Sequence, residues 1–148
     1  MITYRDASSL DVPALVSLDK ELFPYSPWSS GQYLEEISAP TRRFVVALDQ
    51  ARSIIGYAGV FAPGGAEADI LTVGVMPEHR GQGIGRQLMA LITEWAISQG
   101  SIAMMLEVKT DNLTAISLYE SLGYAKLNIR KNYFGNGLDA LVMRKEIP

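Results

Sequence analysis

A glycine-rich turn between an apolar strand and an amphipathic helix constrains this chain more than any other feature. The apolar run over residues 70–75 stops before Pro77, because a proline cannot continue a central strand. Glycines then stand at positions 81, 83 and 85, and apolar residues recur at helical spacing over 87–99. We predict a strand, a glycine loop and a helix in direct succession, with Gly100 ending the helix.

This succession is typical of a backbone cradle for an anionic phosphate group. Glycines let consecutive N–H groups approach a ligand without a side chain in the way, and the start of a helix adds positive partial charge. Arg80 and Arg86 flank the glycines and can add charge-assisted contacts. The alternative interpretation is a glycine-rich turn that only begins an ordinary helix.

Two common phosphate motifs fit the loop poorly. A P-loop needs Gly-Lys followed by Ser or Thr, whereas this chain has Ile84-Gly85-Arg86. The dinucleotide-binding fingerprint needs a third glycine at position 86, which is arginine, and a loop directly after the strand. Glu107 does lie roughly 20 residues beyond the loop, where that fingerprint places its acidic residue, so spacing alone leaves it open.

Composition narrows the class of protein. With 148 residues, of which 48% are hydrophobic and 20% charged, the chain is ordinary for one globular domain, which we expect to span residues 1–148. A net charge of −3 offers no global basic surface for nucleic acid. The lack of cysteine and the single His79 argue against a metal site or a thiolate nucleophile. Without a signal peptide or long apolar span, we expect a cytoplasmic protein with no membrane partner.

The order of the predicted elements indicates an α+β fold. A mixed, mostly antiparallel sheet of about seven strands should carry helices on both faces, and strand 103–108 should run parallel to strand 66–75 across the intervening helix. The other predicted strands cover residues 2–5, 44–48, 53–61, 124–130 and 138–145, and the other helices cover 12–23, 30–37 and 112–121. The loop 24–28, with two prolines and two aromatic residues, either packs a corner of the core or lines a groove.

Three residues have the chemistry of a catalytic site but also simpler explanations. Glu107 lies in an apolar strand, so partial burial should raise its pKa and make it a better proton acceptor near neutral pH. It can equally be a strand-end carboxylate paired with Lys109 or an arginine. Tyr119 fits a packing tyrosine, and Asn112 fits a helix cap.

Two longer patterns resemble the GNAT family of acetyltransferases. The first resembles the acetyl-coenzyme A loop of that family and reads Val75-x-Pro77-x-x-Arg80-Gly81-Gln82-Gly83-Ile84-Gly85-Arg86. The second resembles a downstream signature of the family and reads Asn112-x-x-Ala115-x-x-Leu118-Tyr119-x-x-x-Gly123-Tyr124. Nearly the whole chain, including Leu106-Glu107-Val108-Lys109 and Pro27-Trp28-Ser29, is similar to the branch that acetylates the N-terminus of a ribosomal protein.

The resemblance implies a GNAT fold, acetyl-CoA as co-substrate and a direct transfer to an amine. It implies that Glu107 is the general base and Tyr119 the general acid. The residues that it implies for coenzyme binding are Val73, Gly74, Val75, Arg80, Gly81, Gln82, Gly83, Ile84, Gly85, Arg86 and Asn112. The acceptor should be the N-terminal α-amino group of a protein, ribosomal by resemblance. From the apolar residues that the sheet pattern does not need, we expect Tyr33, Tyr133 and Phe134, with the loop 24–28, to flank a channel that favours a small first side chain.

The chain departs from this branch at two positions. Lys109 replaces the usual arginine, and Phe134 stands where a pair of tyrosines is common. Two other functions stay open. One is a GNAT acetyltransferase for lysine side chains or a small-molecule amine, and the other is a non-catalytic acetyl-CoA sensor. The joint presence of Glu107 and Tyr119 argues against a sensor, and the aromatic channel argues against a small amine.

Overall fold

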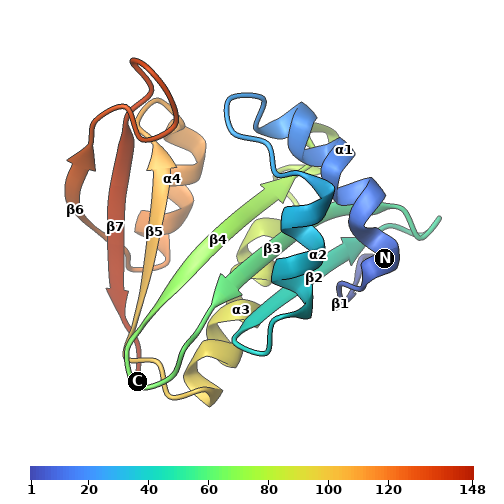
Figure 1. Ribbon diagram of the computed structural model, residues 1–148, viewed down its shortest axis with the longest axis horizontal. Helices are drawn as coiled ribbons and strands as arrows, with labels where there is room; N and C mark the ends of the chain where they lie inside the picture. Colours follow the sequence, from blue (N-terminus) through green and yellow to red (C-terminus); the bar gives the residue numbers. More distant parts are fainter.

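The computed structural model describes residues 1–148, which form one seven-stranded mixed sheet with four α-helices (Figure 1). The strands lie in the order β1-β2-β3-β4-β5-β7-β6. In chain order the elements are β1 (Thr3–Asp6), α1 (Val12–Leu22), α2 (Ser30–Ser38), β2 (Arg42–Leu48), β3 (Ile54–Phe61), β4 (Glu67–Val75), α3 (Ile84–Ser98), β5 (Ala103–Lys109), α4 (Leu113–Ser121), β6 (Ala125–Arg130) and β7 (Ala140–Glu146).

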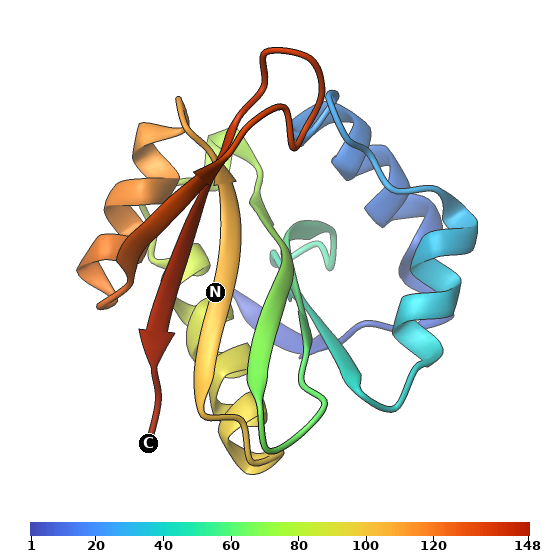
Figure 2. The same cartoon turned by 60° about the vertical axis from the view of Figure 1, so that its left-hand side comes forward.

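Helices cover both faces of this sheet. Figure 2 shows α1 and α2 on one face and α3 and α4 on the other. All neighbouring strands are antiparallel except β4 and β5, which are parallel and joined through α3. This arrangement confirms the predicted α+β fold. None of the helices combines the length and apolar character needed to cross a bilayer.

The core consists of two apolar clusters, one on each face. The larger cluster holds 22 buried residues, among them Leu88 and Ile92 of α3 and Met104 of β5. The smaller cluster holds 7 buried residues, among them Leu15 of α1 and Tyr57 of β3. Burial of these side chains holds the helices on the sheet, since the hydrophobic effect scales with the apolar area removed from water.

Most element starts differ from the predicted ones by one or two residues, and the starts of α3 and β7 have a clear physical cause. Helix α3 starts at Ile84, ahead of the amphipathic run 87–99, because Gly83 takes a left-handed conformation with φ 80° and serves as its N-cap. Strand β7 starts at Ala140 rather than at residue 138, because the Leu138 N–H donates to the Gly135 carbonyl and closes the preceding loop.

Strands β4 and β5 part after a short common stretch. Their register covers only Glu67–Asp69 opposite Ala103–Met105, whereas β4 stays paired with β3 up to Val75. A register shift against Gly59 and Val60 leaves Leu71 as an extra residue in β4, and such a bulge bends its strand. The two strands therefore diverge toward their carboxyl ends (Figure 1).

The close approach of β3 to an aromatic ring gives a test of the smaller core. A Cβ added at Gly59 would overlap the ring of Phe44. We expect Gly59→Ala to lower the free energy of unfolding by about 1–3 kcal/mol, as overpacking does, measured by urea denaturation. Gly31→Ala is the control, because the nearest atom to its added Cβ, Ser29 Oγ, is 3.9 Å away. Equal stability of both variants would contradict this packing.

Candidate functional site

Two cavities meet where β4 and β5 part. The larger, of about 570 Å³, lies between the end of β4, the glycine loop and the starts of α3 and α4. The smaller, of about 110 Å³, lies between β4, β5 and the loop that joins α1 to α2. Seven residues line both cavities, namely Phe23, Tyr25, Val73, Lys109, Asn112, Ala115 and Tyr119. The cavities are thus two halves of one site.

The glycine loop presents bare backbone to the larger cavity. Gly81 and Gly83 have φ of 81° and 80°, and no atom lies within 4 Å of a Cβ built on either residue. No side chain caps the start of α3, so the N–H groups of its first turn are free of a capping partner. This is the geometry of an anion-binding helix start.

The two arginines that flank the loop have different contacts. Arg80 Nε donates to the Val75 carbonyl at 3.1 Å, which ties the loop to the end of β4. Arg86 Nη2 donates to Ser121 Oγ at 2.8 Å, across to α4. Both arginines and Gly85 line the larger cavity, as do Val73, Gly74, Val75, Gly81, Gly83 and Ile84, whereas Gln82 does not.

Asn112 caps α4 beside both cavities. Its side-chain oxygen accepts a hydrogen bond from the Ala115 N–H at 3.2 Å, so the helix-cap explanation is correct for this residue. The amide nitrogen of the same side chain is not needed for the cap. Asn112 can therefore hold the start of α4 and still offer a donor to a ligand.

Glu107 lines the smaller cavity from β5. Its side chain is 24% exposed, and one carboxylate oxygen lies 3.3 Å from Arg130 Nη1 of β6. Burial raises the pKa of Glu107, the negative charge of Asp69 raises it further, and the Arg130 guanidinium opposes both effects. The expected partial burial and raised pKa are confirmed. The pairing with arginine is also present, so the two explanations from the sequence are not exclusive.

Tyr119 reaches the same cavity from α4. The residue is 8% exposed, and burial raises the pKa of its hydroxyl to about 12, with a smaller contribution from Tyr25. A phenol with this pKa stays protonated at neutral pH. The structure thus brings a carboxylate from a strand and a protonated phenol from a helix to one cavity.

The three residues predicted to flank an acceptor channel do not lie together in the structure. Phe134 lines the smaller cavity, with its ring 5.3 Å from that of Tyr25. Tyr133 lies next to it and is 45% exposed, with the Arg130 guanidinium 4.5 Å from its ring centre. Tyr33 is 0% exposed, and its hydroxyl donates to Asp19. The prediction that Tyr33 flanks a channel is wrong, because this residue lies on the inner face of α2.

Residues of the loop 24–28 line the site, which was one of the two roles that the sequence offered for this loop. Tyr25 lines both cavities, while the Trp28 ring packs 4.9 Å from Tyr33 and 5.9 Å from Phe44 in the core. The loop therefore packs against the core and also lines both cavities. The pairing of aromatic residues with prolines was a sequence signal for a shaped loop, but not for its position.

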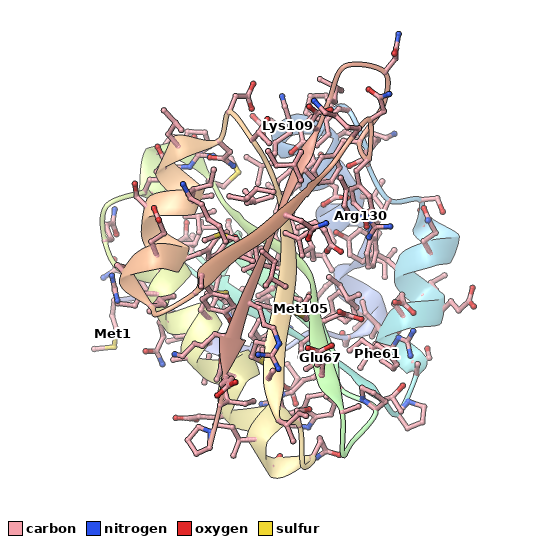
Figure 3. All side chains as sticks on the ribbon, turned by 90° about the vertical axis from the view of Figure 1, so that its left-hand side faces the viewer. Met1, Phe61, Glu67, Met105, Lys109 and Arg130 are labelled. Atoms are coloured by element: carbon pink, nitrogen blue, oxygen red, sulfur yellow. The ribbon has the colours of Figure 1, made fainter.

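Two basic side chains lie beside the site, Lys109 in the wall of both cavities and Arg130 against Glu107. Figure 3 shows Lys109 and Arg130 toward one end of the sheet face, with Met105 and Glu67 farther along it. The Lys109 ammonium lies 4.7 Å from the Tyr25 ring centre and 3.5 Å from Asp111. Lys109 was noted in the sequence only as a departure from arginine, yet it lines both cavities.

Comparisons with known proteins agree with this geometry. Residues 12–124 match the acetyltransferase (GNAT) family. N-alpha-acetyltransferase RimI of Mycobacterium tuberculosis is 31% identical, over 98% of this chain and 92% of the relative. The crystal structure of the ribosomal-protein-S18-alanine N-acetyltransferase from Escherichia coli superposes with a TM-score of 0.86 and 26% identity, over 99% of this chain and 94% of that one.

A longer relative matches only in part. An uncharacterized protein of Mycobacterium leprae is 36% identical over 92% of this chain, but the chain spans only 38% of its length. The match to the acetyltransferase (GNAT) family, over residues 12–124, includes the glycine loop, Glu107 and Tyr119. The chain therefore belongs to the acetyltransferase (GNAT) family of N-acetyltransferases.

Proposed function

We propose that this protein transfers the acetyl group of acetyl-CoA to the N-terminal α-amino group of an acceptor protein. The observation that carries the proposal is that the two cavities share seven wall residues at the parting of β4 and β5. The larger cavity suits the coenzyme and the smaller one suits the end of a peptide. Glu107 lies on the peptide side, and Tyr119 lies in the shared wall.

The larger cavity fits acetyl-CoA in shape and chemistry. Its volume of about 570 Å³ is in the usual range for ligand sites. Bare backbone at Gly81 and Gly83 can receive the pyrophosphate together with the amides at the start of α3. Because β5 has parted from β4, the edge of Val73–Val75 is free to pair with an extended ligand arm. Asn112 lies across the cavity to contact that arm.

Glu107 and Tyr119 have the properties that a direct transfer requires. An α-amino group has a pKa of about 8, so much of it is protonated at neutral pH. Glu107 accepts a proton from the amine, directly or through a water molecule, as nitrogen attacks the thioester carbonyl. The Val75 amide stabilises the developing oxyanion. Tyr119 donates its proton to the departing thiolate, and no covalent enzyme intermediate forms.

The smaller cavity supports an N-terminal peptide as acceptor. It is lined by the aromatic residues Tyr25 and Phe134, with Tyr133 beside it, and its volume of about 110 Å³ favours a small first side chain. The relatives in Mycobacterium tuberculosis and Escherichia coli are named for acetylation of α-amino groups, in the second case of a ribosomal alanine. We propose an N-terminal alanine, ribosomal by analogy, as the acceptor.

A panel of peptides tests this acceptor directly. Release of coenzyme A from acetyl-CoA is measured with short peptides that differ only at their first residue, with N-terminally blocked, lysine-containing copies as controls. We expect alanine and serine to react faster than leucine or phenylalanine, and the blocked peptides to be inert. Acetylation of the blocked, lysine-containing peptides, or of small amines alone, would overturn the proposal.

Substitution in the glycine loop should weaken coenzyme binding selectively. A valine at position 83 is strained at φ 80° and puts a side chain where the pyrophosphate would lie. We expect Gly83→Val to raise the KM for acetyl-CoA at least about tenfold, with a much smaller change for the peptide. Gly65→Val is the control, because Gly65 has φ 64°, open space around its Cβ and no place in either cavity. Equal weakening of both substrates would make the loop only a fold element.

Variants of the two proposed catalytic residues should differ in their response to pH. Glu107→Gln should lower turnover roughly a hundred- to ten-thousandfold at neutral pH, with a deficit that shrinks as rising pH supplies free amine. Tyr119→Phe should show no such rescue, but an acyl donor with a more acidic thiol should recover part of its rate. Glu67→Gln, on the same sheet but outside both cavities, is the control. A small, pH-independent loss in Glu107→Gln would make Glu107 a structural carboxylate.

A further inference from the structure

Asp19 is a buried carboxylate to which the proposed reaction gives no role. It is 2% exposed on α1 and lines the smaller cavity. The Tyr33 and Tyr57 hydroxyls donate to Oδ1 at 2.9 and 2.7 Å, and the Trp28 N–H donates to Oδ2 at 2.8 Å. A buried carboxylate is tolerated only with such partners, and hydrogen bonds to a charged acceptor are the strong ones.

These three bonds join four parts of the fold. Tyr33 belongs to α2, Tyr57 to β3 and Trp28 to the loop between α1 and α2. The two hydroxyls hold the carboxylate in one orientation from the side of the core. The remaining oxygen accepts from the Trp28 N–H, so a side chain of α1 fixes the loop backbone where the Trp28 ring enters the core.

The loop depends on this contact because its backbone has few other hydrogen bonds to the rest of the fold. Pro24 and Pro27 have no N–H to donate. The Ser26 N–H donates to the carbonyl of Phe23, the residue that caps the end of α1 just before the loop. The Trp28 N–H is the donor through which the loop backbone reaches α1. Tyr25, three residues earlier, lies against Phe134 and Lys109 on the wall of both cavities.

We propose that Asp19 is a positioning residue that holds the Tyr25 wall of the acceptor cavity in place through the Trp28 N–H. The inference rests on the proposed function, since it assigns the smaller cavity to the acceptor. It is distinct from the chemistry of Glu107 and Tyr119. Loss of the Asp19 carboxylate frees the loop and weakens acceptor binding, while the glycine loop that would receive the pyrophosphate, and the Val73–Val75 edge of β4, keep their shape.

The test uses the full chain and Asp19→Asn, because an amide has one oxygen and cannot accept from all three donors. With the best peptide of the panel, we expect the peptide KM to rise about tenfold and the KM for acetyl-CoA to stay within about twofold. In a Tyr25→Ala background the same substitution should have no further effect on the peptide KM, because the wall that it positions is already gone.

Asp11→Asn is the matched control for lost stability. Asp11 is also a buried carboxylate near α1, 8% exposed, and it accepts from Arg5 and from the Ser8 N–H at 2.8 Å each, but it lines neither cavity. We expect Asp11→Asn to lower Tm without raising the peptide KM. An equal rise of the peptide KM in both variants, or additive effects of Asp19→Asn and Tyr25→Ala, would overturn the proposal.

A second measurement does not depend on activity. In a Trp95→Phe background Trp28 is the remaining tryptophan, and Asp19→Asn should make its fluorescence more accessible to acrylamide, while Asp11→Asn should not. Unchanged quenching in Asp19→Asn would overturn the positioning role of Asp19 even if no peptide were acetylated. This proposal and the proposed function can therefore fail separately. If Asp19→Asn does not fold, Tyr33→Phe removes one of the three donors and should raise quenching and peptide KM to a smaller extent. No rise in either would overturn the proposal.

Discussion

The parting of β4 and β5 is the constraint on which the rest of this site depends. Two parallel strands that pair over only three residues leave the carboxyl halves of both strands with a free edge. The sheet nevertheless holds together, because β4 remains paired with β3 and β5 remains paired with β7 up to Lys109. The bulge at Leu71 directs β4 away from β5 at the required position. The result is an opening in the middle of a sheet, with backbone polar groups on its borders.

The electrostatics of the site follow from this opening. Glu107 lines the smaller cavity and is half-buried there, where burial and Asp69 raise its pKa and Arg130 limits the rise. Tyr119 lies deeper, on a helix that packs against the larger core cluster, and burial keeps its hydroxyl protonated. One cavity therefore has a carboxyl with a raised pKa and a protonated phenol in its wall, because their environments differ.

The aromatic residues show how position decides the role of a side chain. Tyr33, Tyr57 and Tyr119 are all buried, but the first two donate to Asp19, whereas Tyr119 lines both cavities. Tyr25 and Phe134 come from loops far apart in the chain and meet edge to face over the smaller cavity. The smaller cavity is thus lined by loop residues and by strands β4 and β5, whereas the larger cavity is lined by a strand end and two helix starts. Asp19 lies where the loop 24–28 meets the core, since it accepts from the Trp28 N–H and from two buried tyrosines.

Local patterns in the sequence were sufficient for the element order, the parallel pairing across α3 and the glycine loop at the start of that helix. They also marked Glu107 and Tyr119, because a carboxylate in an apolar strand and a tyrosine in a family signature are visible without coordinates. Tertiary structure alone decided that β4 and β5 part after Asp69, that Tyr33 points into the core and that Tyr25 and Phe134 meet. These features depend on contacts between residues distant in the chain, and the period of a helix or strand carries no information about them. Asp19 shows both kinds of information. Its place on the apolar face of α1 follows from the helical spacing in the sequence, whereas its three hydrogen-bond donors come from three other parts of the fold.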